Sequence, residues 1–282
     1  MRSTSEQPTG PAGPVRRLII LVVAAVAVAA GGCGADTDQV ATPPPEEPIR
    51  YQATVVAEYR HDPASYTQGL EFIDGLLLES TGRRGRSTIR LVDPSSGLPD
   101  LTLDLDPSLY GEGTTVVGDE LIQLTYTSGV ALVRSLDDLA VRREFSYEGE
   151  GWGLCLLDDR LVMSNGSSRL TFRDPATFEA IDSVGVVGPA GEVDQLNELE
   201  CVDGQVWANI YQTNRIVRID PATGAVTGEA DLTELVPPGF EASDELVLNG
   251  IAHEPSTGRY WVTGKEWPVM YELELAPLPD SP

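Results

Sequence analysis

Lysine is almost absent from this chain. Lys265 is the only lysine in 282 residues, and the other eighteen basic side chains are all arginine. Histidine is as scarce, since only His61 and His253 occur. A zinc site built from several histidines, or a Ser-His-Asp triad, therefore has little material to work with. The single lysine is a candidate functional residue, because a compact ammonium and a planar guanidinium are not interchangeable at a binding site.

Cysteine is also rare and occurs only at Cys33, Cys155 and Cys201. No two cysteines have the C-x-x-C spacing, so no redox motif or zinc ribbon is indicated. Cys155 and Cys201 are expected on neighbouring inner strands, where they could pair outside the cytoplasm. The sequence favours two buried thiols over a disulfide and leaves both readings open.

Positive charge is scarce as well. The chain has 44 acidic and 19 basic residues, for a formal net charge of −25. Without the N-terminal leader, which holds three arginines and one glutamate, sixteen basic and forty-three acidic residues remain, a charge of −27. Such a field repels nucleic acid and anionic lipid, so neither is expected as a partner.

Only one long apolar run occurs, the thirteen residues from Leu18 to Ala30 after Arg16 and Arg17. It is shorter than the roughly 20 residues that a membrane-spanning helix needs. A charged start, a short apolar run and small residues before a cysteine are typical of an export signal. The segment from Ala30 to Cys33 resembles a bacterial lipobox with alanine in place of the usual leucine.

These features predict a lipoprotein signal peptide over 1–32 and lipidation of Cys33. A proline-rich, lipid-anchored tether follows at 33–50. The chain is then expected at the extracytoplasmic face of a bacterial cell membrane, held there through the lipid alone. If the lipobox is not used, the leader is an ordinary secretory signal and the protein is secreted.

No long stretch has a helical period, and acidic turns recur instead along 51–275. The turns contain Asp93, Asp137, Asp174 and Asp220, at spacings of 44, 37 and 46 residues. A strand hairpin precedes each of them, with its tight turn at Asp74-Gly75, Gly118-Asp119, Asp158-Asp159 and Asp203-Gly204. Four strands per 40–45 residues are typical of one blade of a β-propeller.

About 225 residues at this spacing predict an all-β, five-bladed β-propeller with four-stranded antiparallel blades. The last repeat contains only three strands, whereas residues 51–59 alternate and have no blade of their own. We expect this N-terminal strand to complete the fifth blade and close the ring with the C-terminal strands, with Val55 and Ala57 covering apolar surface. Residues 276–282 form a C-terminal tail.

The starts of the inner strands are rich in polar and aromatic residues. They read "YTQGLEF", "YGEGTTV", "EGWGLCL", "LNELECV" and "LNGIAHE", and should meet at one mouth of the central channel. With "ESTG", "IDPATG" and "VTGKEWP", these motifs resemble, in order, those of the plant and bacterial glutamine cyclotransferases, which are five-bladed propellers. The resemblance extends from Thr67 to Pro268.

The resemblance implies conversion of an N-terminal glutamine to pyroglutamate with release of ammonia, without metal or cofactor. The partners would be peptides or proteins with N-terminal glutamine, and we expect a monomer. Glu112, between two glycines that would let a substrate approach closely, matches the family's proposed acid/base. Lys265 would stabilise the developing oxyanion and keep Glu112 ionised. The expected substrate-binding residues are Tyr66, Gln68, Tyr110, Tyr126, Trp152, Asn197 and Tyr211.

Glu79 and Glu200 are the alternative carboxylates for the acid/base role. Two other functions stay open. One is a non-catalytic, lipid-anchored propeller that binds peptides or envelope components. The other is a metal-dependent propeller hydrolase, with ligands drawn from Glu71, Glu112, Asn197 and Glu200.

Replacement of Cys33 by alanine tests the anchor. We predict that Cys33→Ala leaves an unlipidated protein that stays in the aqueous phase of a detergent partition, because no other segment is apolar enough to insert. A variant that still enters the detergent phase would mean that the leader is retained or that a second anchor exists.

Overall fold

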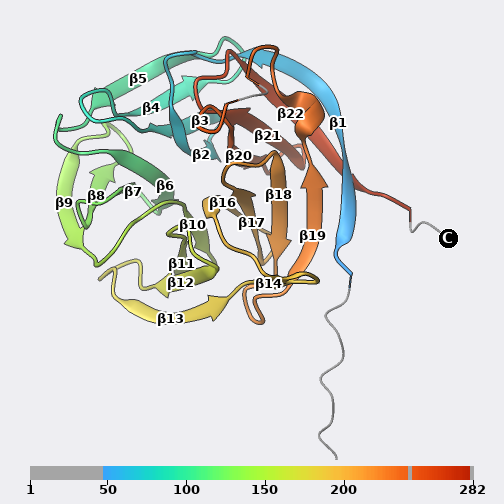
Figure 1. Ribbon diagram of the computed structural model, residues 1–282. Coiled ribbons are helices and arrows are strands. Elements are labelled where there is room, and N and C mark those ends of the chain that lie inside the picture. Colours follow the sequence, from blue (N-terminus) through green and yellow to red (C-terminus); the bar gives the residue numbers. More distant parts are fainter. Residues whose placement is uncertain (1–46, 241–242, 280–282) are drawn as a thin grey trace, which may run out of the picture. The chain divides into compact units, whose positions relative to one another are not determined.

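The computed structural model describes residues 47–240 and 243–279, which are built almost wholly of β-strands (Figure 1). Within these residues the only helix is a single 3-10 turn, η1 (Thr233–Leu235). No helix in the described ranges is long and apolar enough to cross a membrane. The predicted signal peptide, Cys33 and most of the predicted tether lie outside the described residues.

Three sheets each contain four antiparallel strands in chain order. The first consists of β2 (Thr67–Ile73), β3 (Leu76–Thr81), β4 (Thr88–Asp93) and β5 (Leu98–Asp104). The second consists of β6 (Gly111–Val117), β7 (Glu120–Thr125), β8 (Val130–Ser135) and β9 (Val141–Ser146). The third consists of β10 (Leu154–Leu157), β11 (Arg160–Met163), β12 (Arg169–Arg173) and β13 (Ala180–Gly185). These sheets confirm the all-β class and the four-stranded antiparallel unit.

The remaining long strands form one eight-stranded sheet in the order β16-β17-β18-β19-β1-β22-β21-β20. Its strands are β16 (Leu196–Val202), β17 (Gln205–Ile210), β18 (Arg215–Ile219), β19 (Val226–Asp231), β1 (Ile49–Arg60), β22 (Val269–Pro277), β21 (Arg259–Gly264) and β20 (Leu248–Glu254). A small two-stranded ribbon, β14 (Val187–Gly188) with β15 (Gly191–Glu192), precedes β16. Two four-stranded groups are thus joined where β1 lies between β19 and β22.

The predicted hairpin turns lie where the sequence places them. Each of the four connects two antiparallel strands through two residues, as at Asp74-Gly75 between β2 and β3. Both turn residues there have positive φ, 47° and 84°, and Asp203-Gly204 repeats the pattern with 50° and 74°. Aspartate followed by glycine tolerates this left-handed backbone, which matches the twist of the strands.

The second acidic turn is out of register with the sequence repeat. In three sheets the carbonyl of the repeat aspartate accepts an N–H four residues on, as Asp93 does from Gly97. In the second sheet the equivalent carbonyl belongs to Ser135, which accepts from Leu139. Asp137 is therefore not the structural counterpart of Asp93, and the neighbouring Asp138 accepts the local N–H of Ala140 instead. Asp137, which lies two residues after Ser135, matched the sequence repeat only because it is acidic.

Strand β1 pairs with the C-terminal strand β22 in antiparallel register from Tyr51 to Arg60, and with β19 in parallel over its first three residues. It begins at Ile49, so the last two residues of the predicted tether belong to the strand, and β22 continues to Pro277, two residues past the predicted boundary. Such pairing of chain ends gives both strands a hydrogen-bonded neighbour.

Of the two residues of β1 expected to cover apolar surface, Ala57 is half-buried but Val55 is not. A register shift lies between Val55 and Ala57, and Val55 and Val56 are both exposed. Tyr51 packs edge-on against Trp207 at 5.3 Å between ring centroids, and Tyr59 stacks on Trp261 at 4.6 Å. The aromatic side chains, rather than Val55, therefore pack against the tryptophans of β17 and β21 in the same eight-stranded sheet.

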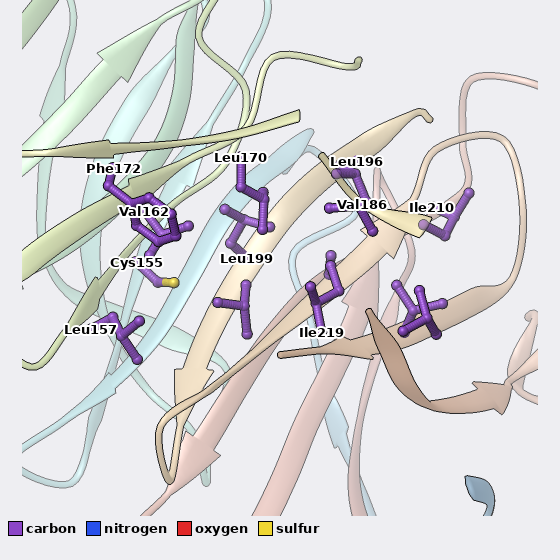
Figure 2. Packing of buried hydrophobic residues seen from close by; sticks show 14 residues of the cluster. Cys155, Leu157, Val162, Leu170, Phe172, Val186, Leu196, Leu199, Ile210 and Ile219 are labelled. Carbon is purple, nitrogen blue, oxygen red and sulfur yellow. The ribbon is translucent and has the colours of Figure 1, made fainter. Parts of the chain in front are cut away.

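The core lies between the faces of adjacent sheets, and Figure 2 shows the part between the third sheet and β16–β18. Side chains from β10, β11 and β12 contact side chains from β16, β17 and β18, and the labelled ones include Val162, Phe172 and Leu199. The outermost strands β5, β9 and β13 are largely exposed. Burial therefore increases toward the first strand of each sheet, where the motifs lie.

Cys155 on β10 and Cys201 on β16 form a disulfide across this interface, with their Cα atoms 5.6 Å apart. The favoured reading of two free thiols is therefore wrong, although the placement on neighbouring inner strands is right. Sequence spacing could not decide the question, because pairing depends on side-chain direction across two sheets.

The first strands of the three four-stranded sheets and the two end strands of the eight-stranded sheet contact one another in sequence: β2 with β6, β6 with β10, β10 with β16, β16 with β20 and β20 with β2. Each of these strands starts at the same edge of its sheet, next to the end of its antiparallel partner. Residues at strand starts and at the ends of second strands are thereby brought together.

Removal of β1 tests its structural role. We predict that a chain starting at His61 aggregates or melts well below a chain starting at Glu47, because loss of β1 leaves one edge of β22 and one edge of β19 unpaired and uncovers Trp207 and Trp261. Retaining His61 keeps the buried contact of its ring with Glu79. Thermal unfolding measured by circular dichroism decides the matter, and equal melting temperatures would contradict it.

Candidate active site

A cavity of about 160 Å³ opens at the edge where the first strands begin. Its lining residues are Tyr66, Gln68, Tyr110, Glu112, Tyr126, Trp152, Asn197, Tyr211 and Lys265. These are the two catalytic and seven substrate-binding candidates from the sequence. They come from the three four-stranded sheets and from the eight-stranded sheet. Each lies on or just before a first strand, or just after a second strand, as Glu112 lies on β6 and Tyr126 follows β7.

Glu112 is 4% exposed, and its Oε1 accepts a hydrogen bond from Gln68 Nε2 at 3.1 Å. Burial raises the pKa of this carboxyl well above its ordinary value, the positive charge of Lys265 lowers it, and the negative charge of Glu150 raises it further. The lysine thus acts on Glu112 in the expected direction, but desolvation is the larger effect. A carboxyl with a raised pKa is suited to taking and returning a proton near neutral pH.

The glycines beside Glu112 serve packing rather than substrate approach. A Cβ on Gly111 would lie 2.6 Å from the carbonyl oxygen of Thr81, and one on Gly113 would lie 2.6 Å from that of Trp152. Gly113 N–H donates to the same Trp152 oxygen at 2.7 Å. The glycines therefore allow β6 to lie close to its neighbours, which brings Glu112 and Trp152 to the same cavity.

Lys265 is 3% exposed and lies between two tyrosines. Its Nζ is 4.9 Å from the ring centroid of Tyr66 and 4.7 Å from that of Tyr211. Burial lowers the pKa of its ammonium to about 8, and the nearby carboxyl of Glu112 acts in the opposite direction. The aromatic faces partly replace the water that this cation has lost.

Trp267 holds the turn that carries Lys265. Trp267 is fully buried, its Nε1 donates to the carbonyl oxygen of Leu246 at 3.0 Å, and a Cβ on Gly264 would collide with its ring. The ring anchors the end of β21, and the backbone N–H of Lys265 donates to Val247 at 2.9 Å. The side chain is then left to enter the cavity.

An amide network positions Gln68. Its Oε1 accepts from Asn249 Nδ2 at 3.3 Å, and the same Nδ2 donates to the carbonyl oxygen of Thr67 at 2.9 Å. Asn249 does not line the cavity, so it acts through Gln68. Asn197 does line the cavity, and its Oδ1 is buried and has no hydrogen-bond partner among the described residues. A buried acceptor without a partner is costly, and a substrate N–H can satisfy it.

The walls are aromatic. Trp152 meets Tyr211 edge-on at 5.5 Å, and Tyr110 meets Tyr126 at 5.8 Å. Trp152 is held by a hydrogen bond from its Nε1 to Glu150 Oε2 at 3.0 Å. Gly166, with φ of 80°, lies against its ring, where a Cβ would approach to 2.6 Å. Sequence reasoning did not single out Glu150 or Gly166, although Glu150 begins the "EGWGL" motif.

Comparison with known proteins identifies the family. The family model described as glutamine cyclotransferase matches residues 23–275. The chain is 37% identical over 227 residues to a glutaminyl-peptide cyclotransferase of Arabidopsis thaliana, covering 78% of this chain and 70% of that protein. The chain belongs to the glutamine cyclotransferase family. The crystal structure of glutaminyl cyclase from Myxococcus xanthus matches with a TM-score of 0.77 and 39% identity, covering 83% of this chain and all of that one.

In this member of the cyclotransferase family, Glu79 lies outside the cavity. Burial would raise the pKa of its carboxyl, but the charges of Arg90 and His61 lower it to about 2. It accepts hydrogen bonds from Arg90 at 2.7 and 2.9 Å and from Thr67 at 2.7 Å. A carboxylate held ionised by this many partners is a structural anchor rather than an acid/base.

Glu200 lies in a second cavity of about 170 Å³, which Glu71 and the disulfide also line. Its Oε1 accepts from the backbone N–H of His253 at 2.8 Å. The four ligands considered for a metal-dependent hydrolase are therefore divided, with Glu112 and Asn197 in one cavity and Glu71 and Glu200 in another. In the described ranges no group of three or more His, Cys, Asp or Glu residues is placed to hold a metal ion.

Proposed function

We propose that this cyclotransferase-family chain is a glutaminyl-peptide cyclotransferase that converts N-terminal glutamine to pyroglutamate and releases ammonia. The observation that carries the proposal is a buried carboxyl, Glu112, and a buried ammonium, Lys265, in one aromatic cavity. At about 160 Å³ the cavity is smaller than the ~300–1,000 Å³ of sites for drug-sized ligands. It therefore suits one amino-acid residue rather than a folded peptide.

In the proposed reaction the substrate's α-amine attacks its own γ-carboxamide carbon. A carbon–nitrogen bond forms, the amine loses a proton, and the amide nitrogen leaves as ammonia after gaining one. Glu112 accepts the proton from the amine and returns it to the leaving nitrogen, so that no net proton is consumed. Because the reaction is intramolecular, a cavity that folds the glutamine into attack geometry supplies much of the acceleration.

The remaining polar groups have complementary roles in this proposal. The Lys265 ammonium stabilises negative charge as it develops on the γ-carbonyl oxygen, in a site without bulk water to screen it. The free Oδ1 of Asn197 accepts an N–H of the substrate. Gln68 orients the carboxyl of Glu112 through its hydrogen bond and is itself held by Asn249. No step needs a metal or cofactor.

We also propose that the described residues form a five-bladed propeller closed by the two chain ends. The circular sequence of contacts from β2 through β6, β10, β16 and β20 back to β2 supports five units. The pairing of β1 with β22 supports closure through the fifth unit. Closure would give the strand starts fixed positions around the cavity.

The location remains a proposal: a lipid-anchored monomer at the extracytoplasmic face of a bacterial membrane, attached through Cys33. The leader pattern supports export. The Cys155–Cys201 disulfide also supports it, because such bonds persist in oxidising compartments. Peptides or exported proteins with N-terminal glutamine would then be the substrates.

Variants of the two buried charges test the mechanism with an amidated, Gln-leading peptide and mass spectrometry for the loss of one ammonia. Wild-type protein should cyclise the peptide in the presence of EDTA, whereas a metal-dependent hydrolase would be inhibited.

Glu112→Gln should lower turnover by about 10²–10⁴-fold. Lys265→Arg should also be impaired, because a bulkier planar group replaces the ammonium.

The pH dependence separates the two roles of the lysine. Lys265→Met removes the positive charge that lowers the pKa of Glu112, so this pKa rises and the acidic limb of the rate profile moves to higher pH. Circular dichroism confirms folding. No ammonia loss with wild-type protein would refute the proposed function, and parental turnover in Glu112→Gln would refute the assigned base.

A further inference from the structure

The loop between β3 and β4, residues 82–87, carries three arginines at the mouth of the cavity: Arg83, Arg84 and Arg86. The guanidinium carbon of Arg83 is 4.4 Å from the ring centroid of Tyr66, and a Cβ on Gly82 would collide with the ring of Tyr110. The loop thus borders two of the lining side chains. It concentrates positive charge at this place in a chain of net charge −25.

Two of the three arginines have acidic partners. Arg83 lies 3.3 Å from Glu266 and 4.0 Å from Glu245, and Arg86 lies 3.8 Å from Glu266. Arg84 differs from both. It is exposed, and no carboxylate of the described residues forms an ion pair with it within 4.0 Å. Within the described part of the chain its charge is therefore not neutralised by an ion pair, although acidic residues outnumber basic ones by more than two to one.

Two hydrogen bonds hold the guanidinium of Arg84 in place. Nη1 donates to the carbonyl oxygen of Ser108 at 2.5 Å, and Nη2 donates to Thr127 Oγ1 at 3.0 Å. Ser108 precedes Tyr110 by two residues, and Thr127 directly follows Tyr126, so the group bridges the two segments that carry this wall of the cavity. A guanidinium has five N–H donors. Two of them are used in these hydrogen bonds, and within the described ranges the other three are left for a ligand.

The rest of the rim has the opposite charge or is occupied. Glu150 accepts a hydrogen bond from Trp152 and interacts with Tyr126, and the carboxylates of Glu245 and Glu266 face Arg83. Carboxylate recognition is therefore restricted to the side of the mouth formed by Tyr110 and Tyr126.

The size of the cavity determines which part of the substrate lies beside Tyr110 and Tyr126. If only the leading glutamine fits inside, the next residue of the substrate lies at the mouth. We propose that Arg84 forms a subsite for a side-chain carboxylate on the residue that follows the N-terminal glutamine, so that peptides beginning Gln-Glu or Gln-Asp are preferred over those beginning Gln-Lys. This inference rests on the proposed cyclotransferase function. Arginine binds carboxylates through paired N–H groups, which adds geometric selectivity to the charge.

The test uses the full chain and amidated tripeptides that differ only at the second residue: Gln-Glu-Ala, Gln-Gln-Ala and Gln-Lys-Ala. An exposed ion pair predicts a preference in kcat/KM for Glu over Gln of about two- to five-fold. It should arise in KM rather than kcat, because the contact lies away from the reacting atoms, and it should decrease at high salt. Gln-Ala with a free or an amidated C-terminus distinguishes a terminal carboxylate from a side-chain one.

Variants assign the preference to the residue. Arg84→Gln should abolish it, Arg84→Glu should reverse it in favour of Gln-Lys-Ala, and Arg84→Lys should retain part of it. Arg142→Gln is the matched control, since this exposed arginine near the start of β9 lies across from the far end of β8, away from Tyr126. It removes the same charge and should leave the preference unchanged.

Each outcome decides between the two claims. Cyclisation of all peptides with the same Glu-to-Lys ratio in wild type and Arg84→Gln overturns the subsite and leaves the function intact. A preference confined to free-acid Gln-Ala overturns the side-chain assignment. Failure of the wild type to cyclise any peptide overturns the proposed function itself.

Discussion

Glu112 and Lys265 are both buried beside one cavity, and the rest of the site depends on this constraint. Burial disfavours both charged forms, so it raises the pKa of the carboxyl and lowers that of the ammonium to about 8. Each charge opposes the effect of burial on the other. Burial therefore moves the pKa values of the two groups toward each other, and their mutual attraction limits this change.

The protein meets this constraint with strand ends rather than with long loops. Antiparallel pairing brings the start of each first strand to the end of its neighbour, so Glu112 on β6 and Tyr126 after β7 reach the same place. Tight approaches at Gly111 and Gly113 set the spacing between sheets. Buried anchors behind the cavity, such as Trp267 and the Glu79 network, hold the backbone that presents the side chains. Sites on rigid elements keep their geometry better than sites on mobile loops.

Much of this arrangement could be predicted from the sequence. Two-residue turns with aspartate and glycine have a local cause, so the hairpins were predictable. The motifs at strand starts contain six of the nine residues around the cavity. The other three, Tyr126, Tyr211 and Lys265, follow second strands and were implied by the resemblance to the family. Features that depend on three-dimensional direction were not. Whether Cys155 and Cys201 pair, and whether Val55 or Tyr51 covers the core, depends on side-chain orientation and on one register shift. Asp137 was assigned to the repeat because it is acidic and near the expected spacing. The hydrogen bond that defines the turn is instead made by Ser135, which occupies the position equivalent to Asp93.

Residues that position the lining side chains were also not predictable from the sequence alone. Asn249 and Glu150 touch lining side chains but not the cavity itself, so only the hydrogen bonds of Gln68 and Trp152 show their part. Arg84 is distinguished only by its contacts: unlike Arg83 and Arg86, it has no ion pair with a described residue, and the run "RRGR" does not show this difference. The sequence motifs therefore identify the residues that line the cavity, whereas the contacts in the structure identify the residues that position them.

A single lysine makes the central claim directly measurable. Isotopic labelling of lysine gives one side-chain resonance, that of Lys265, and its titration by NMR reports the pKa of the ammonium. A buried ammonium in the shared cavity predicts a pKa near 8 in the wild type. Glu112→Gln should lower it further, because the carboxyl charge that raises it is lost. A pKa near the ordinary ~10.4 of a solvated lysine, unchanged in Glu112→Gln, would contradict the burial and coupling of the two charges.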